Sequence, residues 1–434
     1  MSSTKAAGTV ENALWLYAFL LFITTVASWF CYLHFQTYDT RPLYTRQDQF
    51  RDLTNYFGKT ANLYHGAARL GRAGFPIFNY PPPGAFVMKA LLYASPQHPV
   101  RTDLLALATC ILCFAFVALR SIGGGPAVRL AALAAVGMTA VLGYPHVFVA
   151  DRGNTEWVVF ALSGAGLCLL LAGRSVPAAV FLGLAGSIKP FPLLFLFPLI
   201  RSRKYKEVAI ALSTAAVTAL AALIYLGPNP WQAYQYLTPG VKAYTEQYVM
   251  SVPSADEMRF EHSILDGMKF IAVTARLHGL DPYTVVTEMD RMRNQPGGWG
   301  VVPQLVMIYK ITAIPMLVVL LWRFYRAPIL NYLIFLSVAI TVFPPVAAEY
   351  GLLHLYVPFG AFLVFLTHEV STGQVIFPKR VAYVLASTYA LLFSPLTFLH
   401  LYAGFAKLCL LLLVGSLAMR HPMRSRSFDA SLDT

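Results

Sequence analysis

The stretch VPAAVFLGLAGSIKPFPLLFLFPLI, residues 176–200, decides how this chain folds. It is long and apolar enough to enter a bilayer, whose hydrocarbon core is about 30 Å thick, and it carries a single charge, Lys189. Pro190 and Pro192 interrupt the backbone hydrogen bonds of a continuous helix. We therefore predict two short helices that meet at Lys189-Pro190, each covering about 15–20 Å. Their junction must lie in a cavity or a thinned region, because free backbone groups cannot face lipid.

Similar apolar runs recur along the chain, for example over residues 14–35 and 208–226. Of the 434 residues, 57% are hydrophobic and 12% are charged, about half the charged share of an ordinary soluble domain. With a mean hydropathy of +0.58, these apolar residues cannot all be hidden inside a water-soluble globule. The composition therefore predicts an all-α, polytopic membrane protein.

The net charge of +13 comes from short clusters of Lys and Arg between the apolar runs, with no dense basic stripe that would bind nucleic acid. Positive residues are retained on the cytoplasmic side, so we assign these loops to the cytoplasm and expect attraction to anionic membrane lipids. The clusters lie at residues 120–129, 174, 201–206, 323–326, 379–380 and 420–426. The same assignment predicts helices at residues 13–35, 103–119, 130–144, 155–172, 207–225, 302–322, 329–343, 352–366, 381–393 and 400–419. With the two halves of 176–200, this gives about 12 transmembrane segments with both termini inside.

Two long loops fall outside in this topology, a large first loop at residues 36–102 and a second at 227–301. Short internal linkers predict a single transmembrane domain over residues 1–420, followed by a cytoplasmic tail at 421–434. By composition, only residues 1–12 and 421–434 are expected to be disordered. We therefore expect the working face to be extracytoplasmic.

The first external loop contains DQFRDLTNYFGKTANLYHG, residues 48–66, which fits an amphipathic helix on the membrane surface. Asp48 and Asp52 are four residues apart and share a helical face, where a carboxylate could act as a general base. From spacing alone, a solvated face with Arg46 and Arg51 as local partners is the favoured interpretation.

Further polar residues interrupt the apolar runs, and the predicted topology puts every one of them on the external side. They are Arg152 and Asn154 at the end of one helix, Lys189 at the broken helix, His262 in the second loop, and Glu349 with His354. Ionisable residues within apolar spans are costly and usually serve a site. Singly, each could instead reach the interface or form a satisfied ion pair. Their convergence on one side predicts an active site there.

The polar residues belong to a series of motifs with a recognisable order. The series consists of an Asp-led aromatic helix from Asp52 to Gly66, a rigid elbow at Tyr80-Pro81-Pro82 with a short helix to about Ala94, Gly153-Asn154, GLAGSIKPFPLL at 183–194, and Glu261-His262-Ser263. Over roughly residues 48–358, the chain resembles glycosyltransferase family 87, of the glycosyltransferase C superfamily. That family includes bacterial polyprenyl-phosphate-mannose-dependent mannosyltransferases. The family also has an element late in its sequence in which an acidic residue is followed by His. In this chain Glu349 occupies the acidic position, Tyr350 occupies the His position, and His354 follows one turn later.

The resemblance implies a glycosyltransferase C-like fold in the bacterial cytoplasmic (inner) membrane, with the active site outside. It implies an inverting hexosyltransferase, with mannose as the expected sugar. The donor would be a polyprenyl-phosphate-linked sugar, and the acceptor a lipid or glycan of the cell envelope. The absence of a DxD-like nucleotide-sugar motif agrees with a lipid donor. No cofactor or metal is expected, because a phosphomonoester leaving group does not require a metal.

The resemblance also assigns roles to residues. Asp52 would deprotonate the acceptor hydroxyl, and Asp48 would orient or replace it. Cations must meet the charge on the leaving phosphate, and Lys189 and Arg152 would do so with help from His354. The remaining substrate-binding candidates are Asn154, Glu349, His262 and Tyr80.

A transporter or flippase for a lipid-linked sugar is the rival class, because broken helices and buried lysines also occur in transporters. The sequence argues against it in two ways: it contains no matched pair of broken segments in two halves, and its polar residues collect on one side. A non-enzymatic membrane scaffold is a third class.

Cysteine labelling in intact cells tests the predicted topology. Single cysteines at Lys59 and Gln247 should react with an impermeant maleimide from outside, and one at Arg203 only after the membrane is opened, because its basic cluster stays cytoplasmic. Labelling of all three positions from one side would contradict the topology.

Overall fold

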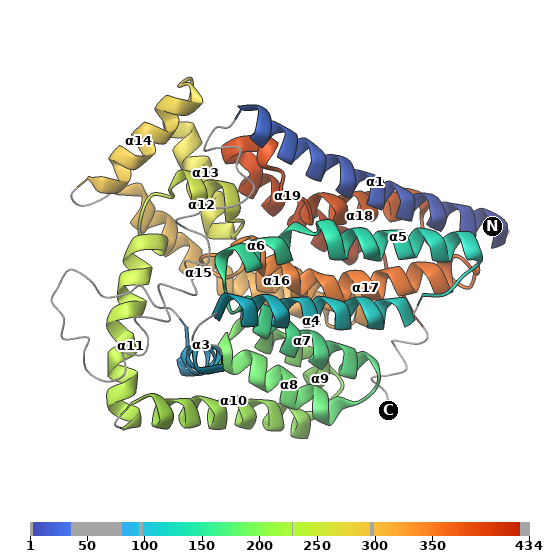
Figure 1. Cartoon of the computed structure of the whole chain (residues 1–434), viewed down its shortest axis with the longest axis horizontal. Helices are drawn as coiled ribbons and strands as arrows, with labels where there is room; N and C mark the ends of the chain where they lie inside the picture. Colours follow the sequence, from blue (N-terminus) through green and yellow to red (C-terminus); the bar gives the residue numbers. More distant parts are fainter. Residues whose placement is uncertain are drawn as a thin grey trace. The chain divides into compact units, whose positions relative to one another are not determined.

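The computed structural model describes residues 3–35, 80–94, 99–120, 122–227, 229–295 and 299–425. The structure is 82% helical, and the described residues form no β-strand (Figure 1). The all-α prediction is therefore confirmed. Internal contacts divide the chain into two compact units: unit 1 comprises residues 1–42, 110–147 and 252–434, and unit 2 comprises 43–109 and 148–251. Whether they act as the single domain predicted for residues 1–420 stays a prediction.

Unit 2 is built around a set of short apolar helices. Its helices are α3 (Pro82–Ala94), the first half of α4 (Pro99–Arg120), the end of α6 (Tyr144–Arg152), α7 (Glu156–Leu171), α8 (Ser175–Ile188), α9 (Phe197–Arg201), α10 (Tyr205–Leu226) and α11 (Pro230–Tyr244). Of these, α8 packs against both α7 and α10. A one-turn π-helix, Thr245–Val249, follows α11.

The predicted break in the apolar stretch 176–200 is confirmed. Helix α8 ends at Ile188, and Lys189 takes an extended backbone with φ −138° and ψ 134°. The cause is Pro190, whose ring disfavours the helical region for the residue before it. A 3₁₀-helix, Phe191–Leu196, then leads into α9. The break leaves Lys189 at the end of one helix and outside the next.

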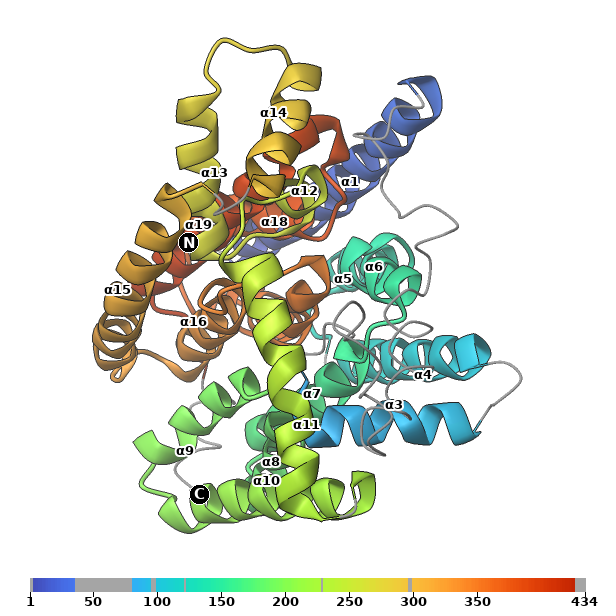
Figure 2. The same ribbon diagram turned by 90° about the vertical axis from the view of Figure 1, so that its left-hand side faces the viewer.

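Unit 1 contains the longest helices and the end of the chain. Its elements are α1 (Ser3–Phe35), the second half of α4, α5 (Pro126–Leu142), the start of α6, α12 (Ala255–Phe260), α13 (Ile264–Arg276), α14 (Pro282–Asn294), α15 (Val301–Phe324), α16 (Ile329–Val342), the 3₁₀-helix η5 (Glu349–Leu355), α17 (Tyr356–Phe365), the π-helix η6 (Leu366–Val370), α18 (Lys379–Leu392), the 3₁₀-helix η7 (Thr397–Tyr402) and α19 (Ala403–Arg420). Helices α13 and α14 form a hairpin (Figure 2).

Two glycines let α19 approach the segment formed by α12 and α13. A Cβ on Gly404 would lie 2.2 Å from the Glu261 carbonyl oxygen and 2.5 Å from that of Met258. A Cβ on Gly267 would lie 2.3 Å from Leu408 Cδ2. Since backbone atoms cannot move aside as a flexible side chain can, only glycine fits at position 404. This contact fixes residues 258–267 against the last helix.

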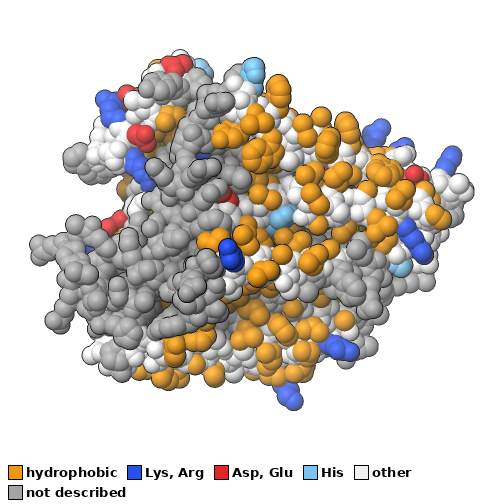
Figure 3. Space-filling model, viewed as in Figure 1, with side chains coloured by type: hydrophobic (Ala, Val, Ile, Leu, Met, Phe, Trp, Pro, Cys, Tyr) orange, Lys and Arg blue, Asp and Glu red, His pale blue; other side chains and the backbone are white. Residues whose placement is uncertain are grey.

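Exposed apolar side chains cover the outer faces of several helices, as expected for a multi-pass membrane protein (Figure 3). Only 11% of the apolar stretch of α10 is buried inside the protein. Among the described residues, six helical stretches are long and apolar enough to cross a membrane: Thr4–His34, Pro126–Arg152, Tyr205–Leu226, Val301–Phe324, Glu349–Val370 and Thr397–Arg420. Shorter apolar helices cover Glu156–Leu171, Ser175–Ile188, Phe191–Arg201 and Ile329–Val342. About 12 crossings, and the sidedness of the loops, stay predictions.

The disorder expected at both ends was wrong in part. Helix α1 begins at Ser3 rather than near residue 13, because its first turns bury Ala6 and Val10. At the other end, Asn331 donates to the carbonyls of Ala418 and His421 and accepts from the backbone of Met423, at 2.6, 2.8 and 2.7 Å. Tertiary packing, which composition does not report, orders residues 3–12 and 421–425.

Candidate functional site

The broken helix of unit 2 positions a polar cluster around Lys189. The Lys189 ammonium forms an ion pair with Glu156, in the first turn of α7, and lies 5.2 Å from the centre of the Tyr80 ring. The Lys189 side chain is 20% exposed and that of Glu156 only 5%. The cation is therefore held in place by a nearly buried carboxylate but keeps access to solvent or ligand.

Asn154 joins the same cluster through its side-chain oxygen. That oxygen accepts hydrogen bonds from the Tyr80 hydroxyl and from the backbone N–H of Glu156, both at 3.0 Å. The turn before it needs a left-handed residue, and Gly153 supplies it with φ +61°. Arg152 closes α6 immediately before this turn. The chain thus brings together Tyr80, Asn154 and Lys189, which sequence analysis had placed in separate motifs.

The arrangement suits an anionic ligand. A partly exposed cation such as Lys189 attracts phosphate or carboxylate oxygens. A phosphate that approached Lys189 would compete with Glu156 for the ammonium. The pair therefore keeps the Lys189 ammonium oriented while no other anion binds it.

A second polar cluster lies wholly within unit 1. Glu349, at the start of η5, forms an ion pair with Lys407 of α19, and neither side chain has any exposed surface. The Tyr144 ring lies 5.0 Å from the Lys407 ammonium. His354, later in η5, is also buried. This pair is sealed from solvent, in contrast to Lys189 and Glu156.

The Glu349 segment is attached to the second long loop. His262 donates its backbone N–H to the Ala347 carbonyl at 2.8 Å, and Glu261 pairs with Ala348 in an antiparallel bridge. The His262 side chain is fully buried, and within the described part of the chain neither ring nitrogen has a hydrogen-bond partner. Burial, together with the positive charge of Lys407, lowers the pKa of His262 to about 3, so its imidazole is neutral.

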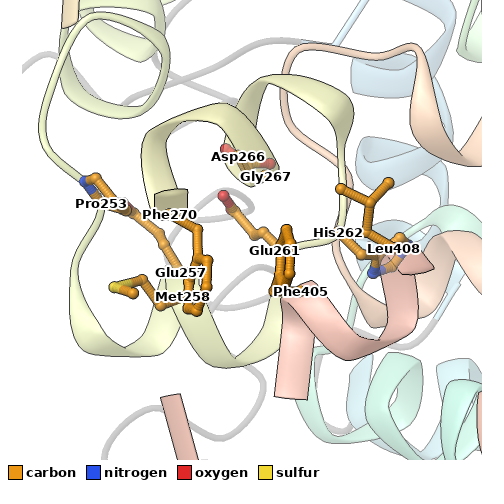
Figure 4. A pocket seen from close by; sticks show the side chains of 10 residues that line it. All are labelled: Pro253, Glu257, Met258, Glu261, His262, Asp266, Gly267, Phe270, Phe405 and Leu408. Atoms are coloured by element: carbon orange, nitrogen blue, oxygen red, sulfur yellow. The ribbon is translucent and has the colours of Figure 1, made fainter. Parts of the chain in front are cut away.

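Beside His262 lies a pocket with about 250 Å³ of empty space, part of it open to solvent (Figure 4). Its lining consists of Pro253, Glu257, Met258, Glu261, His262, Asp266, Gly267, Phe270, Phe405 and Leu408. The carboxyl groups of Glu261 and Asp266 point toward one another. Ser263 donates its hydroxyl to one Asp266 oxygen at 2.5 Å, while the other oxygen has no hydrogen-bond partner among the described residues.

The close acidic groups change one another's protonation. Burial raises the pKa of Asp266 to about 7, although Lys269 opposes this. Burial and the neighbouring Asp266 and Glu257 carboxylates raise the pKa of Glu261 well above its ordinary value. Glu257 is paired with Arg293, with N–O distances of 3.0 and 2.9 Å. At neutral pH, the Glu261–Asp266 pair therefore carries at least one proton.

The ion-pair partners of Lys189 and Glu349 were not predicted from the sequence. Glu156 lies two residues after Asn154, and Lys407 is a lone cation inside an apolar run. Either could have been found as an ionisable residue within a span. Asp48 and Asp52 lie outside the described residues, so their roles stay predictions. No group of three His, Cys, Asp or Glu side chains in the described part of the chain is arranged to hold a metal ion.

Comparison with models of protein families identifies the family of this chain. The model of glycosyltransferase family 87 matches residues 78–343, more than half of the chain. This chain belongs to glycosyltransferase family 87. No curated protein and no solved structure matches it significantly.

Membership of glycosyltransferase family 87 makes the chain a membrane glycosyltransferase. The family match is narrower than the resemblance drawn from the motifs, which ran from about residue 48 to 358. The match includes Tyr80, Asn154 and Lys189. It also includes the segment that carries the acidic residues of the pocket, up to the end of α13 at residue 276. It excludes Asp52 and Glu349, so their roles rest on the motif comparison alone.

The protonated acid pair predicts that stability falls as pH rises. Below about pH 4, Asp266 is neutral in both the folded and unfolded chain, and between its unfolded pKa near 4 and its folded pKa of about 7 the folded chain binds more protons. The free energy of unfolding should therefore decrease from about pH 5 to pH 8, by at most about 1.4 kcal/mol per pH unit for one proton.

Thermal unfolding of the protein in nanodiscs across this pH range measures the slope. Asp266→Asn keeps an acceptor for Ser263 but cannot ionise, so the slope should become shallower. Glu288→Gln, which removes an acid paired with Arg291 on the surface of α14 at 2.8 Å, is the matched control and should keep the wild-type slope. An unchanged slope in Asp266→Asn would show that the pocket acids do not share a proton.

Proposed function

We propose that this chain transfers a hexose, with mannose as the first sugar to test, from a polyprenyl-phosphate donor to a lipid-linked or cell-envelope acceptor. The observation that carries the proposal is the position of Lys189, a partly exposed cation held by Glu156 at a helix break. Such a cation suits a donor whose leaving group is a lipid phosphate. The family supplies the class of reaction, and the donor, sugar and acceptor are our proposal.

The proposed reaction is a single displacement with inversion. The acceptor oxygen attacks the anomeric carbon and forms the new glycosidic bond, while the bond from that carbon to the phosphate oxygen breaks. The acceptor proton passes to a carboxylate, which we assign to Asp52. The electron pair leaves with the polyprenyl phosphate, whose negative charge increases as the bond breaks.

Lys189 would meet that growing charge. In the ground state, the ammonium interacts with Glu156, and Tyr80 limits its movement from the other side. A phosphate oxygen that becomes more negative during bond cleavage competes better for the ammonium than the same oxygen in the intact donor. The cation would therefore stabilise the transition state more than the bound donor, which is the condition for a rate effect. Arg152 would add positive charge from the end of α6.

The proposed site lies on the extracytoplasmic side of a bacterial cytoplasmic membrane, where a lipid-linked donor is used in place of a nucleotide sugar. Purified protein should transfer radiolabelled mannose from polyprenyl-phosphate-mannose into lipid extracts. Movement of the intact donor across proteoliposomes, without any labelled product, would instead support a flippase. Other polyprenyl-phosphate hexoses in the same assay identify the sugar.

Removing the cation tests the role of Lys189. Lys189→Met should lower transfer about 10²-fold, as loss of a group that stabilises transition-state charge typically does. Lys189→Arg should recover part of the rate, because its planar fork is a poor substitute for a compact ammonium.

A second substitution separates catalysis from folding. Lys189→Met leaves the nearly buried Glu156 carboxylate without its ion-pair partner, which lowers stability. Lys189→Met/Glu156→Gln removes both charges and should regain thermal stability while staying inactive. If the double variant regained activity as well, Lys189 would be a structural residue.

The choice between the two acids of the first loop is a separate test. Asp52→Asn should reduce turnover by at least about 10²-fold with donor binding unchanged, because the amide keeps the shape but accepts no proton. Asp48→Asn, four residues earlier in the sequence, is the matched control and should lose far less. The opposite ranking would assign the base to Asp48, and near-normal turnover in the double variant would remove both acids from the chemistry.

A further inference from the structure

Helix α11 occupies an unusual position at the end of a lipid-facing helix. Helix α10 exposes most of its apolar stretch. The helix ends at Leu226, and Gly227 is its C-cap residue. After a short turn, Asn229 caps α11 by accepting from the Gln232 backbone N–H at 2.9 Å. Helix α11 then runs across the end of α10 instead of continuing along it (Figures 1 and 2). A helix that crosses the end of a membrane span lies along the plane of the bilayer.

The surface of α11 is divided into three sectors. At about 100° per residue, Ala233 and Gly240 point to one side, and both are buried in the protein. The exposed remainder splits in two. Trp231, Tyr234 and Val241 share one part of it, with 66%, 54% and 44% of their surfaces exposed. About half of the surface of each of these large side chains is therefore not covered by protein.

Among the described side chains, the other exposed sector is polar apart from Pro239. It holds Gln232, Gln235 and Lys242, all exposed, and Lys242 pairs loosely with Glu246 at 3.9 Å. In a helix exposed only to water, separating the apolar from the polar exposed side chains would bring no gain in free energy. A helix with one buried, one apolar and one polar sector fits a position between protein, lipid and water.

The type of apolar residue indicates which lipid layer is involved. Trp and Tyr combine an apolar ring with a polar tip and are enriched at the boundary between headgroups and acyl chains. Tyr225, the penultimate residue of α10, is 54% exposed and marks the same boundary at the end of the span. Its ring meets Phe86 of α3 edge-on, with centroids 5.2 Å apart. The Trp231 and Tyr234 rings stack with centroids 6.0 Å apart, so exposed aromatic rings occur on both sides of the turn between α10 and α11.

We propose that α11 is a membrane-surface helix whose Trp231–Tyr234–Val241 sector inserts into the headgroup boundary of the bilayer that α10 crosses. The sector follows directly in sequence on the lipid-facing helix α10, and its Trp and Tyr are the residue types enriched at the headgroup boundary; both facts favour lipid over a second copy of the chain. The inserted rings anchor the start of the second long loop at a fixed depth. The proposal does not depend on which sugar or acceptor the enzyme uses.

Nitroxide labels measure the depth of each sector in the full chain reconstituted in nanodiscs. Single cysteines replace Tyr234 and Val241 in the apolar sector and Gln235 and Lys242 in the polar one, in a background without the five native cysteines. Collision with oxygen reports lipid, and collision with a water-soluble nickel chelate reports water. Labels at Leu212, exposed on α10, and at Arg203 calibrate lipid and water.

The two sectors should respond in opposite ways. We expect the ratio of oxygen to nickel collisions to be roughly threefold or more higher at Tyr234 and Val241 than at Gln235 and Lys242, at depths of about 5–10 Å. Equal, water-like ratios in both sectors would overturn the proposal. So would protection of the apolar sector from both reagents, with spectra that sharpen on dilution by unlabelled chain, since that result identifies a second copy.

The native tryptophan provides a measurement that does not need the cysteine-free background. The fluorescence difference between the wild-type chain and Trp231→Phe isolates the emission of Trp231. Lipids brominated near the headgroup end of the acyl chain should quench this difference signal more than lipids brominated near the chain end. Trp322→Phe, which removes a tryptophan 78% exposed on the membrane span α15, is the matched control. Absence of quenching by either lipid would overturn the proposal.

Discussion

A backbone that stops being helical among apolar surroundings must find other partners for its polar groups, and this constraint explains the architecture of unit 2. Pro190 ends α8 and pushes Lys189 into an extended conformation. The Lys189 side chain then contacts Glu156, at the start of α7, and the ring of Tyr80, which precedes α3 in the sequence. The same proline that ends the helix therefore places Lys189 where Glu156 and Tyr80 contact its ammonium.

The two buried ion pairs differ in what they can do. Glu349 and Lys407 have no exposed surface, so any ligand that displaced one of them would leave an unpaired charge in an apolar region. Lys189 keeps a fifth of its side chain exposed and can exchange one anionic partner for another. The fully sealed pair is thus suited to hold η5 against α19, and the open pair is suited to binding. Comparable residue types serve different purposes because their burial differs.

Local rules predicted a large part of the fold and a smaller part of the site. The helix break followed from Pro190 and Pro192, and the apolar runs located most of the long helices. Ion pairs between helices were beyond reach, because Glu156 and Lys407 are recognisable only once the rotation and packing of α7 and α19 are known. The acidic pocket had a sequence signal that went unused: Glu257 and Glu261 are four residues apart, and Asp266 follows within two turns. The ordered chain ends depended on contacts such as Asn331 with Met423, which composition cannot reveal.

The close approach at Gly404 has a consequence for how the protein is made. Residues 258–267 pack against a helix that lies near the end of the chain, so they cannot reach their final environment when they first leave the ribosome. At typical synthesis rates of about 5–20 residues per second, the wait for α19 lasts roughly 10–30 s. During that time Glu261, His262 and Asp266 have neither their neighbours nor their cover. Assembly of this region therefore waits for a helix that lies beyond the segment matched by the family model.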